Sequence, residues 1–213
     1  MHSVFVNSLL NPKKLSEIVQ SKVENEVMSN HRIESDFIVL NSDSLNKQEN
    51  CVEVKKGKSY FIPAIIFWAW SQKLNCEISG QYFSSIFASI LTEKSKEFNL
   101  SKHLGDRKLE ISLIEVPSGF EYSNNGYFAY ALVFYSYGFG ELIQPVHQKF
   151  IFRYRITEKG TELKSDRFEF IFANQLVNSK FSTVKFINNY LDQLSSDFEM
   201  KSNEFIDRII EDL

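Results

Sequence analysis

The sequence predicts an α+β fold in which helices pack on one face of an antiparallel-rich sheet and the C-terminus is helical. Between residues 108 and 173, apolar and polar residues alternate in runs separated by turn residues, which is typical of an antiparallel strand meander. After residue 182, apolar residues recur at steps of three and four, which indicates helix. No linker rich in Pro, Gly or Ser divides the chain, so we expect a single α+β domain spanning 1–213.

The elements before the meander follow from local patterns. They are a helix at 12–28, strands within 33–78 and a helix at 81–98. Asn11 is a suitable N-cap for the first helix and Pro12 a suitable first residue, and this helix is expected to cover an edge of the sheet. Pro63 cannot donate a hydrogen bond to a strand ladder, so the strand region should bend there. Ser79 is expected to cap the helix at 81–98, whose apolar stripe should lie on the sheet.

Four strands are predicted in the meander. Their ranges are Lys108–Val116, Tyr127–Tyr137, Leu142–Ile156 and Leu163–Ala173. Turns are expected at 124–126 (Asn-Asn-Gly) and 138–140 (Gly-Phe-Gly), because Asn and Gly tolerate the positive φ of tight hairpins. In the third strand, Phe152 alternates with Arg153, so one face should pack on a core and the other meet water. The second strand is apolar on both faces, and we expect it to be central and covered on both sides.

The C-terminal helices are predicted over 182–212. Ser195-Ser196-Asp197 either breaks this region into two helices or is crossed by one. On the outer face of the third strand, the bases Lys149, Arg153 and Arg155 are expected to form cross-strand ion pairs with Glu169 rather than an anion-binding patch.

Charge and motifs narrow the function classes. The net charge is −3 and the basic residues are scattered, so we predict no nucleic-acid partner. The chain has no glycine-rich phosphate loop, His-Glu-x-x-His or Cys-x-x-Cys motif, so we expect no cofactor, no metal site and no catalytic residues. His103 and Asp106, in one loop, are the only start that the sequence offers for acid–base catalysis. Cys51 and Cys76 could pair if their strands are neighbours, but we expect two free, half-buried thiols.

The stretch Tyr60–Trp70 (YFIPAIIFWAW) is the hardest to explain by packing alone. It is about half the length needed to cross a bilayer, so we predict no transmembrane segment. It is either a core strand or one wall of an apolar groove that takes a lipid, a peptide or a partner helix. With the aromatic residues of the following helix, the candidate binding residues are Tyr60, Phe61, Phe67, Trp68, Trp70, Phe83 and Phe87.

The order of elements resembles that of the small α+β envelope lipoproteins that assist bacterial ABC-type transporters. The residues that carry the resemblance are Phe67–Trp70, the Phe83-x-x-Ile86-Phe87 helix, the Leu109-x-Ile111-x-Leu113 strand and the helix Val184–Leu194. The resemblance covers roughly residues 33–198. The lipid-anchored cysteine near such a family's mature start is not present in positions 1–10.

The resemblance implies a non-enzymatic accessory or adaptor protein of the cell envelope that binds a protein partner or lipid through an apolar surface. It also implies a periplasmic or outer-membrane-associated location if a leader has been removed, and otherwise we expect a cytoplasmic protein. The first alternative is a helix-grip binder of a lipophilic small molecule, in which the C-terminal helix closes a curved sheet over a cavity. The second alternative is an enzyme of unknown reaction.

Overall fold

The structure is a computed structural model that describes residues 10–27, 38–42, 45, 50–55, 65–172, 174–178 and 182–213. In chain order the described elements are α2 (Pro12–Val27), β1 (Ile38–Asn41), β2 (Asn50–Lys55), β3 (Ile65–Glu77), α3 (Gly80–Glu97), α4 (Leu100–Leu104), β4 (Arg107–Glu115), β5 (Gly119–Ala131), β6 (Phe134–Pro145), β7 (Lys149–Glu158), β8 (Thr161–Ile171), β9 (Leu176–Asn178) and α5 (Thr183–Glu211). This arrangement confirms the α+β class, the strand meander and the helical C-terminus.

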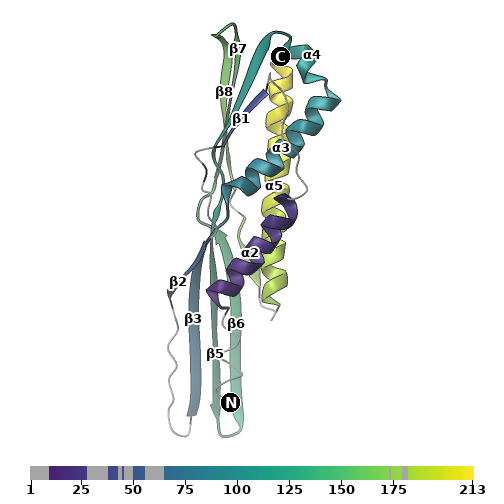
Figure 1. Cartoon of the computed structure of the whole chain (residues 1–213). Coiled ribbons are helices and arrows are strands. Elements are labelled where there is room, and N and C mark those ends of the chain that lie inside the picture. Colours follow the sequence, from purple (N-terminus) through teal and green to yellow (C-terminus); the bar gives the residue numbers. More distant parts are fainter. Residues whose placement is uncertain are drawn as a thin grey trace.

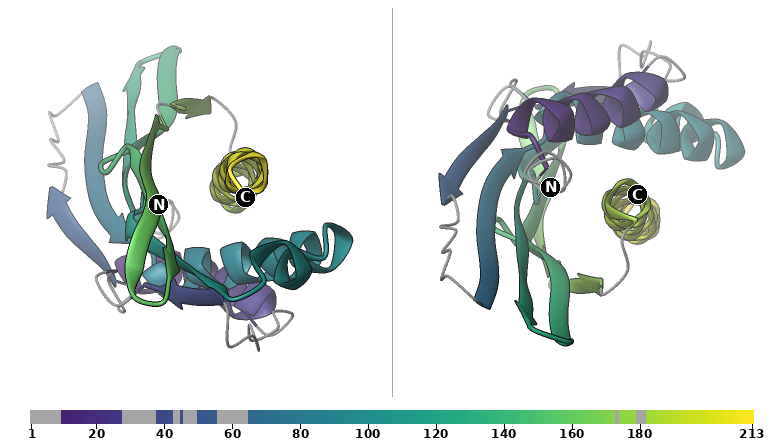
Figure 2. Two further views of the ribbon diagram at one scale, coloured as in Figure 1. Left: turned by 90° about the horizontal axis from the view of Figure 1, so that it is seen from above. Right: turned by 90° about the horizontal axis from the view of Figure 1, so that it is seen from below.

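The strands form two sheets. Sheet A has the order β1-β4-β7-β8 and sheet B the order β2-β3-β5-β6-β9. Neighbouring strands are antiparallel except β1 and β4, which are parallel. The molecule is elongated, with sheet A at the upper end of Figure 1, sheet B at the lower end and the helices on one side. Helix α5 contacts β7 of sheet A and β6 of sheet B, so it joins the two sheets along their length (Figures 1 and 2).

The prediction of a single sheet is therefore wrong. The meander divides between the two sheets, because β4, β7 and β8 belong to sheet A whereas β5 and β6 belong to sheet B. Strand β5 instead pairs along its full length with β3, from Ile65 opposite Ala131 to Glu77 opposite Gly119. The pairing of β3 with β5, which are distant in sequence, produces no local sequence pattern. The turn residues alone therefore suggest that consecutive strands form one continuous meander.

Two of the predicted turns lie inside strands. Gly126 belongs to β5, where a Cβ atom would stand 2.1 Å from Cζ2 of Trp70. Gly138 belongs to β6, where a Cβ atom would stand 2.5 Å from Cε1 of Tyr127. These glycines make room for aromatic rings that lie flat on the sheet, so they serve close packing rather than a positive φ. The meander consequently has five strands instead of four.

The turn between β5 and β6 is formed by Leu132 and Val133. Leu132 adopts a left-handed φ of 55°, and Ala131 pairs directly with Phe134. The segment 127–137, expected to be a central strand, therefore contains the end of β5, the turn and the start of β6. This hairpin end lies at one tip of the molecule (Figure 1). The expectation that this segment is covered on both sides is wrong.

The main core lies between the sheets and the helices, and many of its side chains are phenylalanines. Alternation along β7 is confirmed, since Phe150, Phe152, Tyr154 and Ile156 are buried whereas Arg153 and Arg155 are exposed. The ring of Phe152 stacks on Phe205 of α5 at 5.0 Å between centroids, and Phe83 of α3 meets Phe198 of α5 at 5.1 Å. Edge and stacked contacts of this kind add stability beyond the area that they bury.

The helices agree closely with the sequence. The Ser79 side chain accepts a hydrogen bond from the Gln81 backbone N–H, which confirms the N-cap of α3. Helix α5 is continuous from residue 183 to 211, and the Ser195 hydroxyl donates to the Leu191 carbonyl, so the helix crosses its serine pair. His103, expected to share a loop with Asp106, lies in the short helix α4.

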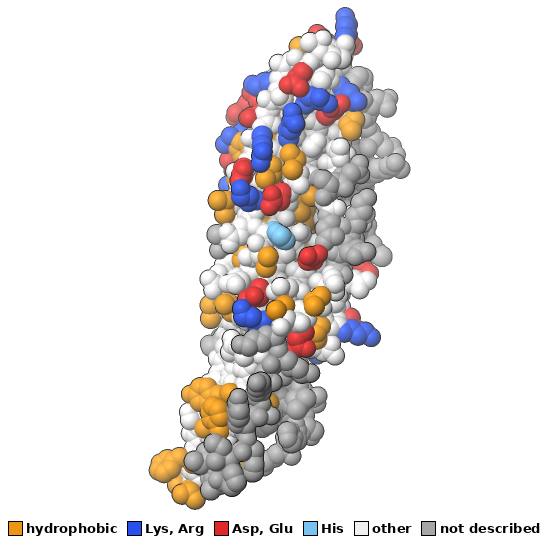
Figure 3. All heavy atoms as spheres, turned by 90° about the vertical axis from the view of Figure 1, so that its left-hand side faces the viewer, with side chains coloured by type: hydrophobic (Ala, Val, Ile, Leu, Met, Phe, Trp, Pro, Cys, Tyr) orange, Lys and Arg blue, Asp and Glu red, His pale blue; other side chains and the backbone are white. Residues whose placement is uncertain are grey.

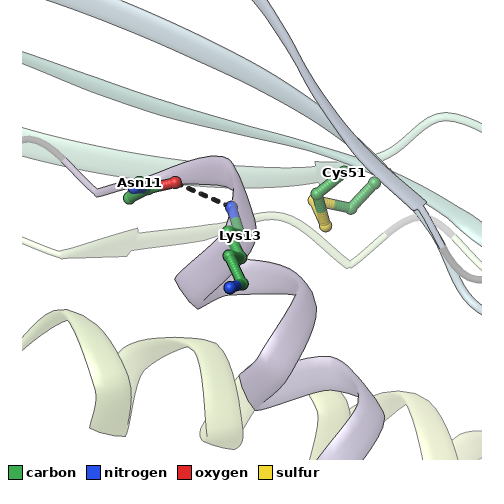
Figure 4. Close-up of a disulfide and its surroundings, with 4 residues drawn as sticks. Asn11, Lys13 and Cys51 are labelled. Atoms are coloured by element: carbon green, nitrogen blue, oxygen red, sulfur yellow. Dashed lines mark hydrogen bonds between the residues drawn. A yellow bond between two sulfur atoms is a disulfide. The ribbon is translucent and has the colours of Figure 1, made fainter.

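Cys51 and Cys76 form a disulfide, so the expectation of free thiols is wrong. The two residues are directly opposite in the β2–β3 pair, with Cα atoms 4.1 Å apart. Figure 4 shows the bond beside the start of α2, where Asn11 Oδ1 accepts a hydrogen bond from the Lys13 backbone N–H at 2.9 Å. Helix α2 contacts β2, which is an edge strand of sheet B, and the predicted edge-covering position of this helix is confirmed.

The outer face of sheet A carries cross-strand ion pairs. Lys149 lies 2.5 Å from Glu169, as predicted. Arg155 instead binds Glu110 of the neighbouring strand β4, with its Nε atom 3.1 Å from the carboxylate. Sheet A is therefore a charged scaffold on its outer side.

Candidate binding surface

The tip of the β5–β6 hairpin carries the most exposed large apolar side chains of the described structure. We call Leu132, Val133 and Phe134 the apex, and their side chains are 79%, 81% and 77% exposed. Large apolar residues of this kind are ordinarily buried, and a contiguous exposed group marks an interaction surface. In Figure 3, hydrophobic side chains gather at the lower end of the molecule, and charged groups cover the upper part.

The sequence around the apex contains no charge over a long distance. No Asp, Glu, Lys, Arg or His occurs between Glu121 of β5 and Glu141 of β6. The neighbouring strand β3 is likewise free of charge from Ile65 to Gln72. Because β3, β5 and β6 are hydrogen-bonded neighbours, these segments form one three-stranded end that we call the charge-free end of sheet B.

Tyrosines follow directly behind the apex. Tyr130 and Tyr135 are a cross-strand pair adjacent to the turn, and Tyr127 and Tyr137 lie further back. All four are exposed, and we call them the tyrosine belt. A tyrosine combines an apolar ring with a polar hydroxyl, which suits a boundary between an apolar phase and water.

Trp70 closes the base of the charge-free end. Its ring lies over Gly126, and its indole Nε1–H donates a hydrogen bond of 2.8 Å to Asn124 Oδ1. The neighbouring Trp68 ring lies 5.0 Å from that of Trp70. These contacts hold the aromatic side chains of β3 against β5 at the base of the charge-free end.

A buried polar network fastens the hairpin to the rest of the fold. The Glu141 carboxylate, 1% exposed, accepts hydrogen bonds from Tyr122 OH at 2.6 Å, from Asn178 Nδ2 at 2.6 Å and from the Thr183 hydroxyl. Within the described residues, no Lys or Arg forms an ion pair with this carboxylate. Burial, and then the hydrogen bond to Glu141, raises the pKa of Tyr122 above its usual range. The network therefore keeps Tyr122 a neutral donor.

The network also connects four elements, since Tyr122 belongs to β5. Glu141 lies in β6, Asn178 in β9, and Thr183 is the first residue of α5. A carboxylate that is satisfied by three donors is stable without a counter-ion, provided that all the donors remain in place. The base of the hairpin is thus anchored to the long helix.

An open groove of about 900 Å³ runs along the charge-free end. Its lining residues are Phe67, Ala69, Trp70, Ser123, Asn125, Gly126, Tyr127, Gly138, Phe139, Gly140, Glu141, Leu142, Gln175 and Val177. Glu141 is the only acid or base among them. The groove lies toward the base of the charge-free end and reaches β9 through Val177.

The structure separates the predicted binding residues into three groups. Tyr60 and Phe61 lie outside the described residues. Phe67, Trp68 and Trp70 are half-buried on β3, and two of them line the groove. Phe83 and Phe87 have no exposed surface, because the apolar stripe of α3 packs on sheet A and α5. The expectation that these two residues line a surface is therefore wrong.

The sequence interpretation missed the apex. The pattern predicts a covered strand instead, because an apolar run with Gly126 before it and Gly138 and Gly140 after it looks like a core strand between two turns. The available signal is the stretch between Glu121 and Glu141, which contains none of the charged residues that usually cover a solvent-exposed hairpin.

The other predicted chemistry finds little support. His103 and Asp106 are both exposed, and in the described structure neither side chain forms a hydrogen bond or an ion pair. They are therefore not organised as an acid–base pair. Among the described residues, no group of three or more His, Cys, Asp or Glu side chains is placed to hold a metal ion.

The interface between α5 and the sheets is tightly filled. Ile187, Leu194, Phe198 and Ile206 of α5 have no exposed surface, and Phe198 contacts Phe150 of β7 at 5.5 Å between ring centroids. The groove at the charge-free end lies outside this interface. This packing weighs against a helix-grip cavity beneath α5.

Comparisons with protein-family models, with curated proteins and with solved structures found no match. In the part of the chain that the structure describes, no helix has both the length and the apolar character needed to cross a membrane.

Proposed function

We propose that this protein is a non-enzymatic accessory or adaptor of the cell envelope that attaches to a lipid or a protein partner through the charge-free end of sheet B. The observation that carries the proposal is the apex, where three adjacent large apolar side chains are each more than three-quarters exposed. Leaving such side chains in water costs free energy that burial against an apolar partner would recover, about 1.5–3 kcal/mol for each.

The packing at the base of the hairpin supports the same proposal. Trp70 on Gly126 and the hydrogen bonds to Glu141 hold the charge-free end in one arrangement before it meets a partner. A preorganised surface loses less conformational entropy on binding than a loop that must become ordered. The hairpin is therefore suited to present the apex rather than to fold over it.

The disulfide supports a location in the envelope. Disulfides persist in oxidising compartments such as the bacterial periplasm and are rare in the cytosol. Cys51 and Cys76 join β2 to β3, which is one of the three strands of the charge-free end. In an oxidising compartment this disulfide would link β3 covalently to the edge strand β2, which α2 contacts.

Site-specific photo-crosslinking in cells tests the proposal. A photoreactive residue replaces Val133 of the apex in one variant and Ile171 of β8, an exposed apolar residue of sheet A, in the control. We expect adducts to lipid or protein from position 133 and none from position 171. Equal labelling at both positions, or no adduct at position 133, would refute the proposed surface.

A further inference from the structure

We infer that the apex is a shallow membrane anchor, in which Leu132, Val133 and Phe134 insert into the interface of a lipid bilayer. This inference rests on the proposed function and specifies its partner as a lipid surface. The apex offers only aliphatic and phenyl side chains and no hydrogen-bonding side chain. The group that it would contact is therefore the acyl chains of the lipids, and not a charged or polar headgroup.

The first argument is the shape of the surface. The hairpin extends beyond the helices to one end of the molecule, and its turn residues are the most exposed large apolar residues of the described structure (Figure 1). Small lipophilic ligands bind in concave sites that enclose most of their surface. A projecting turn cannot enclose a ligand, but it can enter a soft apolar phase.

The second argument is the order of residue types along the hairpin. The apolar apex comes first, the tyrosine belt begins at the next cross-strand pair, Tyr130 and Tyr135, and an uncharged stretch that includes Asn, Ser and Gly follows. The first charges are Glu121 and Glu141, and at about 3.3 Å per residue Glu141 lies roughly 23 Å behind Phe134.

This order matches the depth profile of a bilayer interface. Acyl chains accept aliphatic side chains, headgroups accept tyrosine, and charged groups remain in water. In a protein–protein interface, the polar residues surround the apolar centre as a rim. Here the tyrosine hydroxyls and then the first charges appear in one direction away from the tip, along the axis that would be the membrane normal.

The third argument limits the depth of insertion. Ala131 and Phe134 are still a paired rung of the hairpin, so only Leu132 and Val133 form the turn. The hydrocarbon core does not tolerate unpaired strand edges, so the hairpin itself would stay out of it. Side chains of the apex can still reach the boundary between headgroups and acyl chains, about 5–10 Å deep.

The uncharged character of the charge-free end, in the residues that the structure describes, predicts which lipids suffice. Adsorption through lysine or arginine requires anionic lipids and weakens as salt shortens the Debye length from roughly 10 Å at 0.1 M to 3 Å at 1 M. The apex has no such residues, so binding should occur on phosphatidylcholine alone and should be insensitive to salt.

Flotation of the purified full chain with phosphatidylcholine vesicles tests the inference. The unmodified protein should float with the vesicles equally at low and high salt. The triple variant Leu132→Ser, Val133→Ser, Phe134→Ser should lose about tenfold or more in partition coefficient for each large apolar side chain removed. The matched control, Leu163→Ser with Ile171→Ser, removes two exposed apolar residues of β8 and should float like the unmodified protein.

Thermal unfolding of both variants checks that they remain folded, since all the changed side chains are exposed. The inference is overturned if the unmodified protein does not float, or if the control variant loses flotation as much as the triple variant does. Loss of flotation at high salt would also overturn it. If position 133 crosslinks to a protein in cells while vesicles remain unbound, the proposed function stands and the lipid assignment fails.

Discussion

Two tyrosine-to-phenylalanine substitutions should change stability in opposite directions, although each removes one buried hydroxyl group. The Tyr122 hydroxyl donates to the Glu141 carboxylate at 2.6 Å. The Tyr190 hydroxyl is buried and, within the described residues, has no hydrogen-bond partner. The environment of each hydroxyl therefore determines the sign of the effect.

Tyr122→Phe removes a charge-assisted hydrogen bond from a carboxylate that has no ion pair in the described structure. Such a bond is worth about 1.5–3 kcal/mol, and for a chain of this size each kcal/mol changes the melting temperature by about 2–4 °C. We expect the melting temperature to fall by roughly 3–12 °C. The loss should be larger than for an average surface substitution, because Glu141 remains buried with fewer donors.

Tyr190→Phe removes a polar group that pays a desolvation cost without a compensating bond. The ring contacts with Phe120 at 5.2 Å and Phe172 at 6.2 Å are available to phenylalanine as well. We expect the free energy of unfolding to rise by about 1 kcal/mol, which is a gain of roughly 2–4 °C.

Urea and thermal unfolding, followed by circular dichroism at neutral pH, measure both variants against the unmodified protein. The reasoning is refuted if Tyr122→Phe is as stable as the unmodified protein, or if the two variants are destabilised to the same extent. The first outcome would show that Glu141 does not depend on Tyr122. The second would show that the Tyr190 hydroxyl has a partner.

Three further predictions follow from the described contacts. Gly126→Ala should lower the free energy of unfolding by about 1–3 kcal/mol and shift the tryptophan fluorescence, because the added Cβ would displace the Trp70 ring. At Gly140 an added Cβ would meet no atom within 4 Å, so Gly140→Ala should change neither stability nor fluorescence much. Equal effects in the two variants would contradict this packing. Burial raises the pKa of Tyr122 and of Tyr190, so as the pH rises the unfolded chain releases these protons before the folded chain does. The urea concentration at the unfolding midpoint should therefore be constant below about pH 10 and fall above it, less steeply in Tyr190→Phe. An identical slope in that variant would count against the prediction. Reduction of the Cys51–Cys76 disulfide, which spans a sequence separation of 25, should cost about 3 kcal/mol, and a melting temperature unchanged by reductant would contradict its presence.

Periodic elements of this fold are readable from the sequence. The helices at 12–28 and 81–98 carry strong caps and apolar stripes, and the alternation along β7 identifies which side of sheet A is buried. These features depend on residues close together in sequence. Local patterns therefore suffice to predict them.

The hairpin at the charge-free end is not predictable from local sequence, because its glycines are required by tertiary packing and not by turns. Gly126 and Gly138 accommodate rings from Trp70 and Tyr127, and only the pairing of β5 with β3 and β6 shows this. The real turn at Leu132 uses a left-handed φ in a residue that rarely adopts it, so no turn signal marks it. The disulfide depended on the same pairing, since Cys51 faces Cys76 only in the β2–β3 register.

The most direct test of the account is the environment of residue 133 in the presence of a bilayer. An environment-sensitive fluorophore is attached to cysteine in a Val133→Cys variant, with Leu163→Cys as the control and the native disulfide kept oxidised. On addition of phosphatidylcholine vesicles, the account predicts a blue shift and quenching by lipid-borne quenchers at position 133, with no change at position 163. An unchanged spectrum at position 133, or equal changes at both positions, would contradict the assignment of the apex as the membrane-contacting surface.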